Sequence, residues 1–161
     1  MSPVTTSMAS TSVSPFQVRL AATQDMDQLC ELAEHLLTQI RAIGAVEDAR
    51  RVFERTMKSG DLGIVLVAAH KNGLCGYAYA AYEWRAEFGG ETMDIVAVWV
   101  DPQWRSKGVG GSLVNALLQT ARERGIKRVS SEVHPGNSAI EHTLESSGFD
   151  PERRTLWGLR L

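Results

Sequence analysis

Periodic apolar positions divide the first part of the chain into one strand and two helices. Residues 16–20 alternate between apolar and polar side chains, which predicts a strand. Leucines at helical spacing from residue 29 onward predict an amphipathic helix that runs toward Ile43 and stops at Gly44. A second apolar stripe, residues 46–57, predicts another helix with an exit at Gly60.

Three β-rich runs fill the middle of the chain. The run 64–70 is closed by Lys71-Asn72-Gly73, in which the Asn-Gly pair is a strong hairpin signal, and the return strand is 74–85. After Gly89-Gly90 the chain enters a run that is almost wholly apolar from Ile95 to Val100, as is typical of a central strand covered on both faces. We expect an antiparallel hairpin that leads into a central strand.

A glycine-rich turn and a helix follow the central strand. The helix begins near Gly110 and ends at Gly125, and the run 126–133 then predicts a further strand. A right-handed crossover allows this strand to lie parallel to 93–100. The resulting βαβ unit places the turn at the end of the sheet where open α/β sheets bind ligands.

The remaining pattern predicts one helix and one strand. Asn137 is a typical N-cap for a helix that stops at Ser147-Gly148-Phe149, and residues 155–161 alternate as a terminal strand would. The whole pattern predicts a single α/β (α+β) domain over residues 16–161. Residues 1–15 form a Ser- and Thr-rich arm that we expect to be flexible.

The turn that follows the central strand has the composition of an anion site. Glycines let backbone N–H groups approach a ligand closely, and the start of a helix adds unpaired N–H groups and a positive dipole end. Arg105 and Lys107 place two cations beside it, which suits a pyrophosphate. We therefore expect anion binding by Arg105, Ser106, Lys107, Gly108, Val109, Gly110, Gly111 and Ser112.

Two nucleotide-binding motifs fit this turn less well, and a tight connection without any ligand is the plainest alternative. A dinucleotide-binding loop of the form G-x-G-x-x-G, counted from Gly108, has Leu113 where its last glycine should be. The Gly-Lys-Ser/Thr order of a Walker A loop is absent from the sequence.

The order of Arg105, Gly108 and Gly110 matches [Q/R]-x-x-G-x-[G/A], and the stretch resembles motif A of the GNAT superfamily of N-acetyltransferases. In that family the loop holds the pyrophosphate of acetyl-coenzyme A. A second segment is also similar to the family, because Asn137 is followed eleven residues later by Gly148-Phe149. The resemblance covers nearly all of residues 16–161. It implies a mixed, mostly antiparallel sheet flanked by helices, with a splayed parallel strand pair that forms the acetyl-coenzyme A groove.

The resemblance also implies how the rest of the donor is held. In the family the pantetheine arm inserts between the two parallel strands. Backbone groups near Val98 and Val100 would then pair with the arm, and an N–H group of this segment would polarise the thioester carbonyl. Asn137 would reach the arm from the opposite side while it also caps its helix.

The activity that the resemblance implies is acetyl transfer to a primary amine of a small molecule or peptide, by direct attack in a ternary complex. An alkylammonium has a pKa of about 10.4, so a base must take its proton. The candidates in the expected region are Glu83, Asp94, Glu132 and His134. Of these, we rank Glu83 and His134 first as catalytic residues.

One position departs from the family pattern. Many members carry a tyrosine seven residues after the asparagine, where it protonates the leaving thiolate, and this chain has Leu144 there. Leucine cannot donate a proton. A non-catalytic acyl-coenzyme A-binding module, acting as a sensor or regulatory subunit, is therefore the alternative function.

Composition limits the other classes of function. The chain has 161 residues, a net charge of -2 and a pI near 6.1, which gives no reason to expect a nucleic-acid or membrane partner. Cys30 and Cys75 form neither a disulfide framework nor a metal-ligand cluster, so we expect no metal and a reducing environment. Without a secretory signal or membrane-length run, a cytoplasmic protein is expected. The oligomeric state stays open, with a homodimer as one option.

Overall fold

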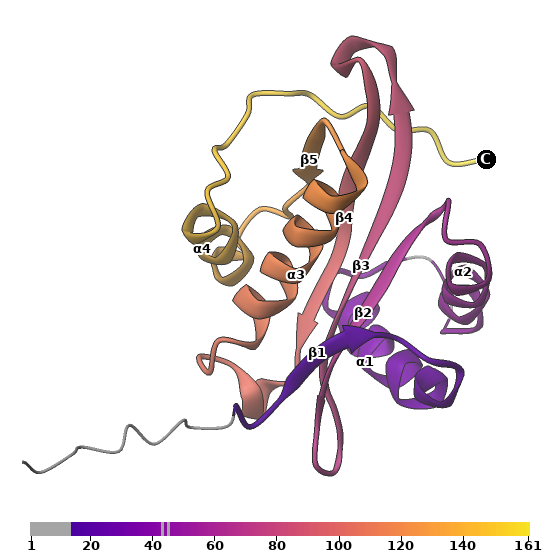
Figure 1. The fold of residues 1–161 in the computed structure, drawn as a ribbon, viewed down its shortest axis with the longest axis vertical. Coiled ribbons are helices and arrows are strands. Elements are labelled where there is room, and N and C mark those ends of the chain that lie inside the picture. The colour runs from indigo at the N-terminus through magenta and orange to yellow at the C-terminus, as the bar shows by residue number, and fades with distance from the viewer. Residues whose placement is uncertain (1–13, 43, 45) are drawn as a thin grey trace, which may run out of the picture.

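A mixed sheet forms the centre of the molecule in the computed structural model, which describes residues 14–42, 44 and 46–161 (Figure 1). Its five strands lie in the order β1-β2-β3-β4-β5. Neighbours are antiparallel except for β4 and β5, which are parallel, so the predicted mostly antiparallel sheet is confirmed. The strands are β1 (Gln17–Leu20), β2 (Gly63–His70), β3 (Gly73–Arg85), β4 (Gly90–Val100) and β5 (Arg128–Ser131).

Helices cover both faces of this sheet, as predicted. Figure 1 shows α3 and α4 on one side of it and α1 and α2 on the other. The four helices are α1 (Met26–Gln39), α2 (Val46–Lys58), α3 (Val109–Arg124) and α4 (Ser138–Ser146). Single turns of 3-10 helix, namely η1 (Thr23–Asp25), η2 (Ala86–Phe88) and η3 (Pro102–Trp104), precede α1, join β3 to β4 and follow β4. No helix in the described part of the chain is long and apolar enough to cross a membrane.

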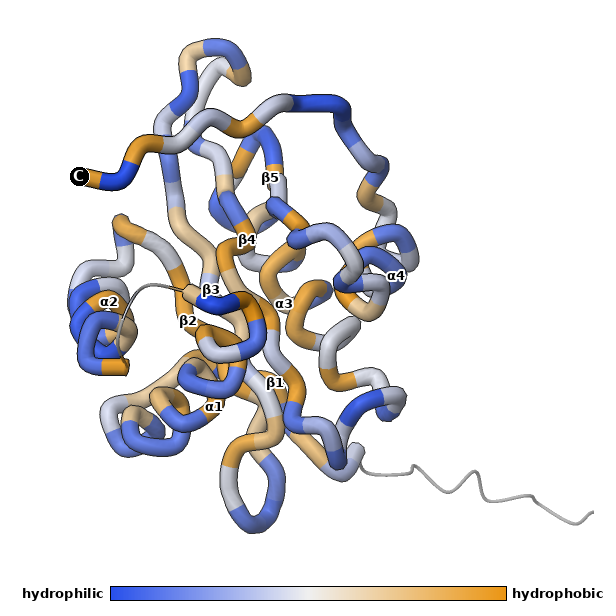
Figure 2. The backbone as a smooth tube through the Cα atoms, turned by 180° about the vertical axis from the view of Figure 1, so that it is seen from behind, coloured by the Kyte–Doolittle hydropathy of each residue, from blue (hydrophilic) through white to orange (hydrophobic). Residues whose placement is uncertain are grey.

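The alternation of side chains along the strands divides the core into two layers. On β2, Val65 and Val67 pack with α1 and α2, whereas Leu66 and Ala68 pack with α3. Figure 2 shows that apolar residues are concentrated in the strands and in α3, whereas α2 is largely polar. The two faces of a strand thus serve two separate hydrophobic clusters.

The two-residue loop of the β2–β3 hairpin lies one residue earlier than the Asn72-Gly73 pair that predicted it. His70 pairs with Gly73, so the loop residues are Lys71 and Asn72, and Gly73 begins the return strand at a φ of +143°. A Cβ atom at Gly73 would lie only 2.7 Å from Oε1 of Gln28 on α1. The backbone angle favours glycine here, whereas the flexible end of the Gln28 side chain could move aside for a larger residue.

A buried ion pair fixes the entry to α1. Asp25 is 7% exposed, and its carboxylate accepts hydrogen bonds from both terminal nitrogens of Arg19, at 2.6 and 2.9 Å. The backbone N–H of Ala22 donates to the same carboxylate at 2.7 Å. The Arg19 guanidinium, and to a smaller extent the Ala22 amide, hold the pKa of Asp25 below its usual value although burial acts in the opposite direction.

We expect Asp25→Ala to lower the free energy of unfolding by about 1–3 kcal/mol, because it leaves two partly buried donors without an acceptor. A carboxyl with a lowered pKa stabilises the fold above its unfolded pKa of about 3.9, and this contribution is lost as the pH falls through the folded pKa. Urea titrations at neutral and acid pH measure both effects. Asp27→Ala is the control, because the Asp27 side chain is 87% exposed and its removal should change stability by less than about 0.5 kcal/mol.

Three predicted elements differ in the structure. The strand expected over 126–133 is shortened to 128–131, and the terminal strand expected over 155–161 is wrong, because residues 149–161 form no helix or strand. Alternation shows that a segment can form a strand but not that a neighbouring strand is there to pair with it. The first helix ends at Gln39 and not near Ile43 and Gly44 as expected, because the backbone leaves the helix at Ile40 and Arg41 has a φ of 52°. Most of the N-terminal arm, residues 1–13, lies outside the described residues.

Candidate active site

The parallel strands β4 and β5 separate halfway along β4. Their pairing runs from Thr92 with Arg128 to Ile95 with Ser131, where β5 ends while β4 continues to Val100. The predicted splayed pair is confirmed in this form.

A β-bulge lies at the point of separation. On the other side of β4, Ala80 of β3 pairs with Ile95 and Tyr79 pairs with Ala97, so that Val96 is an extra residue. A bulge of this kind bends its strand and increases the local twist. The bulge therefore divides β4 into a first half that is paired with β5 and a second half that extends beyond the last β5 pair.

A cavity of about 160 Å³ lies where the two strands diverge. The end of α1, the bulged part of β4, the segment that continues from β5 and the start of α4 all line it. Its walls combine apolar side chains with two carboxylates, an imidazole and an amide. The lining residues are Leu36, Ile40, residues 94–98, residues 131–134, Asn137 and Ile140.

Asp94 is the half-buried carboxylate of this cavity. It lies opposite Ser130 in the β4–β5 ladder, and its Oδ1 accepts a hydrogen bond from the Ser130 hydroxyl at 3.3 Å. Burial raises the pKa of Asp94 and outweighs the lowering effect of the Ser130 hydroxyl, while the nearby carboxylates of Glu132 and Glu83 add smaller contributions in the upward direction. A carboxylate with a raised pKa is a better proton acceptor than an exposed one.

The structure separates the two residues that the sequence ranked first. His134 lines the cavity together with Asp94 and Glu132. Glu83 lies outside the lining, is exposed, and pairs its carboxylate with Arg85 at 3.3 Å. What favours Asp94 is its position in the parallel strand pair, opposite Ser130. The sequence alone does not give this pairing, because it does not show the register of the two strands.

The glycine-rich turn leads into α3 with its first amides available. Gly108 has a φ of +81°, and Ser106 has a φ of 60°, which costs a non-glycine residue about 1–2 kcal/mol. The first helical bond runs from Ser112 N to Gly108 O at 3.0 Å, so the amides of residues 109–111 precede it. Within the described chain no side chain caps this end of α3. The turn therefore fits an anionic ligand.

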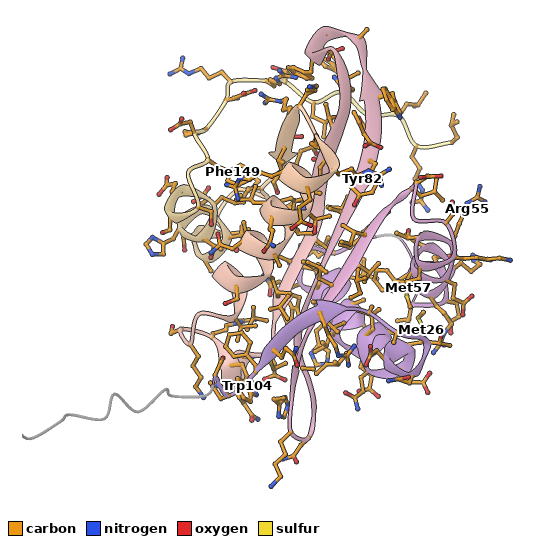
Figure 3. The ribbon with its side chains drawn as sticks, viewed as in Figure 1. Met26, Arg55, Met57, Tyr82, Trp104 and Phe149 are labelled. Carbon is orange, nitrogen blue, oxygen red and sulfur yellow. The ribbon has the colours of Figure 1, made fainter. Side chains whose placement is uncertain are left out.

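Aromatic rings hold the two cations of the turn. The Arg105 guanidinium lies 4.9 Å from the centre of the Trp99 ring and its Nε donates to Val100 O at 3.1 Å. Lys107 Nζ lies 5.2 Å from the centre of the Trp104 ring, which Figure 3 places near the start of β1. Both charges are thereby fixed at the edge of the turn.

Gly110 occupies a narrow gap between β4 and α4. A Cβ atom added there would lie 3.7 Å from Cγ2 of Val100 and 3.8 Å from Oγ1 of Thr143, which are ordinary contact distances. A methyl group would therefore fit at this position, whereas a larger side chain would extend beyond the Cβ atom into the space next to Val100 and Thr143. Gly110 thus lies beside Val100, one of the two β4 residues whose backbone the resemblance assigns to the pantetheine arm.

The start of α4 contributes the amide of the cavity. Asn137 is the N-cap of α4, as predicted, and its Oδ1 accepts from Ile140 N at 3.5 Å. Leu144, seven residues after Asn137, is buried and belongs to the core that α3 forms with the sheet. The position that carries tyrosine in many family members therefore supports packing in this chain.

Neither cysteine has the surroundings of a nucleophile. Cys30 and Cys75 are both buried as free thiols. Burial raises the pKa of both, that of Cys75 to about 11, and the Cys75 thiol donates to Ala68 O. In the described ranges 14–42, 44 and 46–161, no three His, Cys, Asp or Glu side chains are grouped in a way that could hold a metal ion.

The chain belongs to the acetyltransferase (GNAT) family, which residues 26–149 match. This match includes α1, the sheet from β2 to β5, the glycine-rich turn and α4, and ends at Phe149. The resemblance recognised in the sequence is thereby confirmed.

Individual relatives agree with this assignment. A mycothiol acetyltransferase of Propionibacterium freudenreichii subsp. shermanii is 29% identical over 128 residues, which are 78% of this chain and 40% of that protein, so the chain spans less than half of its relative. An integron cassette protein from the mobile metagenome of Cole Harbour Salt Marsh superposes with a TM-score of 0.79 at 23% identity, over 90% of both chains. The aminoglycoside N-acetyltransferase AAC(6')-Iy, solved in complex with CoA, gives 0.77 at 16% identity, over 90% of this chain and 94% of that one. These last two similarities establish the shared fold.

Proposed function

We propose that this domain catalyses acetyl transfer from acetyl-coenzyme A to a primary amine of a small molecule or peptide, by direct attack in a ternary complex. One observation carries the proposal: the half-buried carboxylate of Asp94 lines a cavity at the divergence of β4 and β5, in the same βαβ unit as the uncapped start of α3. Donor binding and proton removal would thus be served by adjoining parts of one unit.

Donor binding is assigned to the turn and to the open edge of β4. The amides of residues 109–111 and the cations of Arg105 and Lys107 would hold the pyrophosphate. Backbone groups near Val98 and Val100, with Asn137 opposite them, would hold the pantetheine arm. Bound acetyl-coenzyme A would supply the thioester that the amine attacks.

Proton removal is assigned to Asp94. A protonated amine is attracted to the cavity by Asp94 and Glu132, and the raised pKa of Asp94 makes this carboxylate the better acceptor for the proton. The sequence candidates Glu83 and His134 remain the competing assignments. Of these two, only His134 lines the cavity.

The leaving thiolate does not need the missing tyrosine. A thiol with a pKa of about 8.5 is a tolerable leaving group without an acid, and water, the amine proton or His142 can supply the proton afterwards. The buried leucine at position 144 nevertheless favours a second candidate function, an acyl-coenzyme A-binding module without turnover.

Thiol release from acetyl-coenzyme A tests the proposal. The panel contains alkylamines, an aminoglycoside and peptides with free amines, and isothermal titration measures donor binding in parallel. Amine-dependent release of coenzyme A with formation of the acetylamide supports the transferase. Tight donor binding without release for any amine would support the binding module, and the absence of donor binding contradicts both functions.

A further inference from the structure

Trp99, near the end of β4, is a buried residue with an unpaired polar atom. Its side chain is 8% exposed and packs in the layer between the sheet and α1. Among the described residues, its indole Nε1 is the one buried side-chain nitrogen or oxygen without a hydrogen-bond partner. A buried donor without an acceptor destabilises a fold, and a phenylalanine would fill much of the same space without that cost. The reason for an indole at this position has to come from what its ring contacts.

Two side chains from distant parts of the chain contact this ring. The Arg105 guanidinium lies 4.9 Å from the ring centre, and the His35 ring of α1 lies 6.2 Å away at an interplanar angle of 48°. Among aromatic side chains, tryptophan attracts a cation most strongly, and the attraction grows where the pair is shielded from water. The indole therefore holds the Arg105 guanidinium more strongly than a phenyl ring would.

Arg105 connects this ring to the glycine-rich turn. Trp99 faces α1, whereas the turn leads into α3 on the other face of the sheet (Figure 1). The Arg105 side chain joins the two at the end of β4, because its Nε donates to Val100 O at 3.1 Å while its guanidinium lies against the indole. The bond to Val100 uses Nε alone, so the terminal nitrogens of the guanidinium can donate to an anion.

The backbone of the turn needs support at this point. Ser106, the residue after Arg105, has a φ of 60°, and Gly108 has a φ of +81°. The backbone bond from Arg105 N to Pro102 O is long, at 3.4 Å. A strained non-glycine conformation persists only where the surrounding structure fixes it. Arg105, held on Trp99 directly before Ser106, supplies a contact of this kind.

We propose that Trp99 is a positioning residue for the donor site. Through Arg105 it holds the glycine-rich turn in the form that presents the guanidinium and the amides of residues 109–111 to a pyrophosphate. Trp99 would act without touching the ligand, because its ring lies in the layer that faces α1. A turn that is ordered before the ligand arrives has less entropy to lose on binding. The inference rests on the proposed function, since it concerns the same donor site.

A graded series at position 99 tests the effect on donor binding. In isothermal titrations, Trp99→Leu is expected to raise the Kd for coenzyme A about tenfold, and Trp99→Phe, which keeps a smaller ring, should give an intermediate Kd. Phe53→Leu is the matched control, because it removes a buried ring of the same layer whose ring contacts are Tyr77 and Tyr79. Its Kd should equal that of the wild type. If Trp99→Leu bound coenzyme A as tightly as Phe53→Leu does, the proposal would be wrong.

A double-mutant cycle shows whether Trp99 acts through Arg105. Arg105→Lys keeps the charge but loses the planar guanidinium and the Nε bond, and it should also raise the Kd about tenfold. The double variant should be only slightly weaker than either single variant, because both substitutions remove the same contact. Fully additive losses would mean that Trp99 and Arg105 act independently, which contradicts the proposal.

Nuclear magnetic relaxation of the ligand-free protein separates this inference from the proposed function. Backbone order parameters of residues 106–108 are expected to be about 0.85 in the wild type and below about 0.6 in Trp99→Leu, with no change in Phe53→Leu. Loss of order in Trp99→Leu supports the role of Trp99 even if the wild type fails to bind coenzyme A, a failure that would contradict the proposed function alone. A turn that stays equally ordered in Trp99→Leu overturns the role of Trp99 even if coenzyme A binds. Thermal melts verify folding, and Trp99→Phe takes the place of Trp99→Leu in both measurements if the leucine variant unfolds.

Discussion

Replacing Asp94 by asparagine is expected to lower kcat/KM for amine acetylation by about 10²- to 10⁴-fold, the range typical for loss of a general base. Asparagine keeps the size of the side chain and can still accept from the Ser130 hydroxyl, but it cannot take a proton from the amine. Donor affinity should change little, because Asp94 lies on β4 before the bulge and away from the turn at Arg105. Initial rates and donor titrations measure the two effects separately.

Two comparisons make the Asp94 result specific. Glu83→Gln removes the same charge outside the cavity and should lower kcat/KM only a few-fold; a loss as large as that of Asp94→Asn would return the role to Glu83. In the wild type, kcat/KM should fall as the pH drops through the pKa of Asp94, which lies above its usual value. Asp94→Asn should lose this dependence, and an unchanged acid limb in the variant would contradict the assignment.

The same substitution has a predicted effect on stability. Because the folded protein binds the Asp94 proton more tightly than the unfolded chain does, stability from this group is present at low pH and is lost as the pH rises through the raised pKa. Asp94→Asn is therefore expected to be at least as stable as the wild type at neutral pH. A thermal melt verifies this, and it shows that lost activity is not due to unfolding.

Replacing Gly110 by tryptophan is expected to lower the affinity for coenzyme A by at least about 100-fold, equivalent to about 2.7 kcal/mol. A Cβ atom at Gly110 already meets Val100 and Thr143 at contact distance, so an indole would extend from there into space beside the amides of residues 109–111, which are assigned to the pyrophosphate. The increase in melting temperature on adding coenzyme A, which depends on ligand concentration over Kd, should disappear.

Two control variants define the cause of that loss. Gly110→Ala should bind coenzyme A within a few-fold of the wild type, because its methyl group meets its neighbours at ordinary contact distance. Asn115→Trp adds the same bulk on the exposed face of α3 and should have no effect. Unchanged affinity in Gly110→Trp would contradict the assignment of the turn as the donor site.

The sequence predicted those parts of the fold that depend on local pattern. Helical stripes located α1, α2 and α3, positive-φ glycines ended α3 and α4, and the glycine-rich turn was found from Arg105, Gly108 and Gly110. The parallel pairing of β4 and β5 followed from the handedness of the crossover between them. These features rest on the spacing of residues in one segment or on a general rule of connection.

The remaining features depend on contacts between distant segments. The bulge at Val96 is defined only by the pairing of β4 with β3, and the place of Asp94 in the cavity only by its register with β5. Alternation alone could not show that residues 155–161 would lack a neighbouring strand. The candidate proton acceptors were therefore harder to rank from the sequence than the candidate anion-binding amides, because the start of a helix fixes the position of those amides.

The extra residue in β4 changes which of its residues face α3. Met93 and Ile95 face α3, but beyond Val96 the phase of the alternation is inverted, and the even-numbered Val98 and Val100 face α3 instead. Without the extra residue, the alternation of side chains would keep one phase along the whole strand. The odd-numbered Trp99 would then face α3, on the side opposite Asp94, and could not pack against α1. The change of phase lets one continuous strand place Asp94 on the cavity in its first half and pack Trp99 against α1 in its second half.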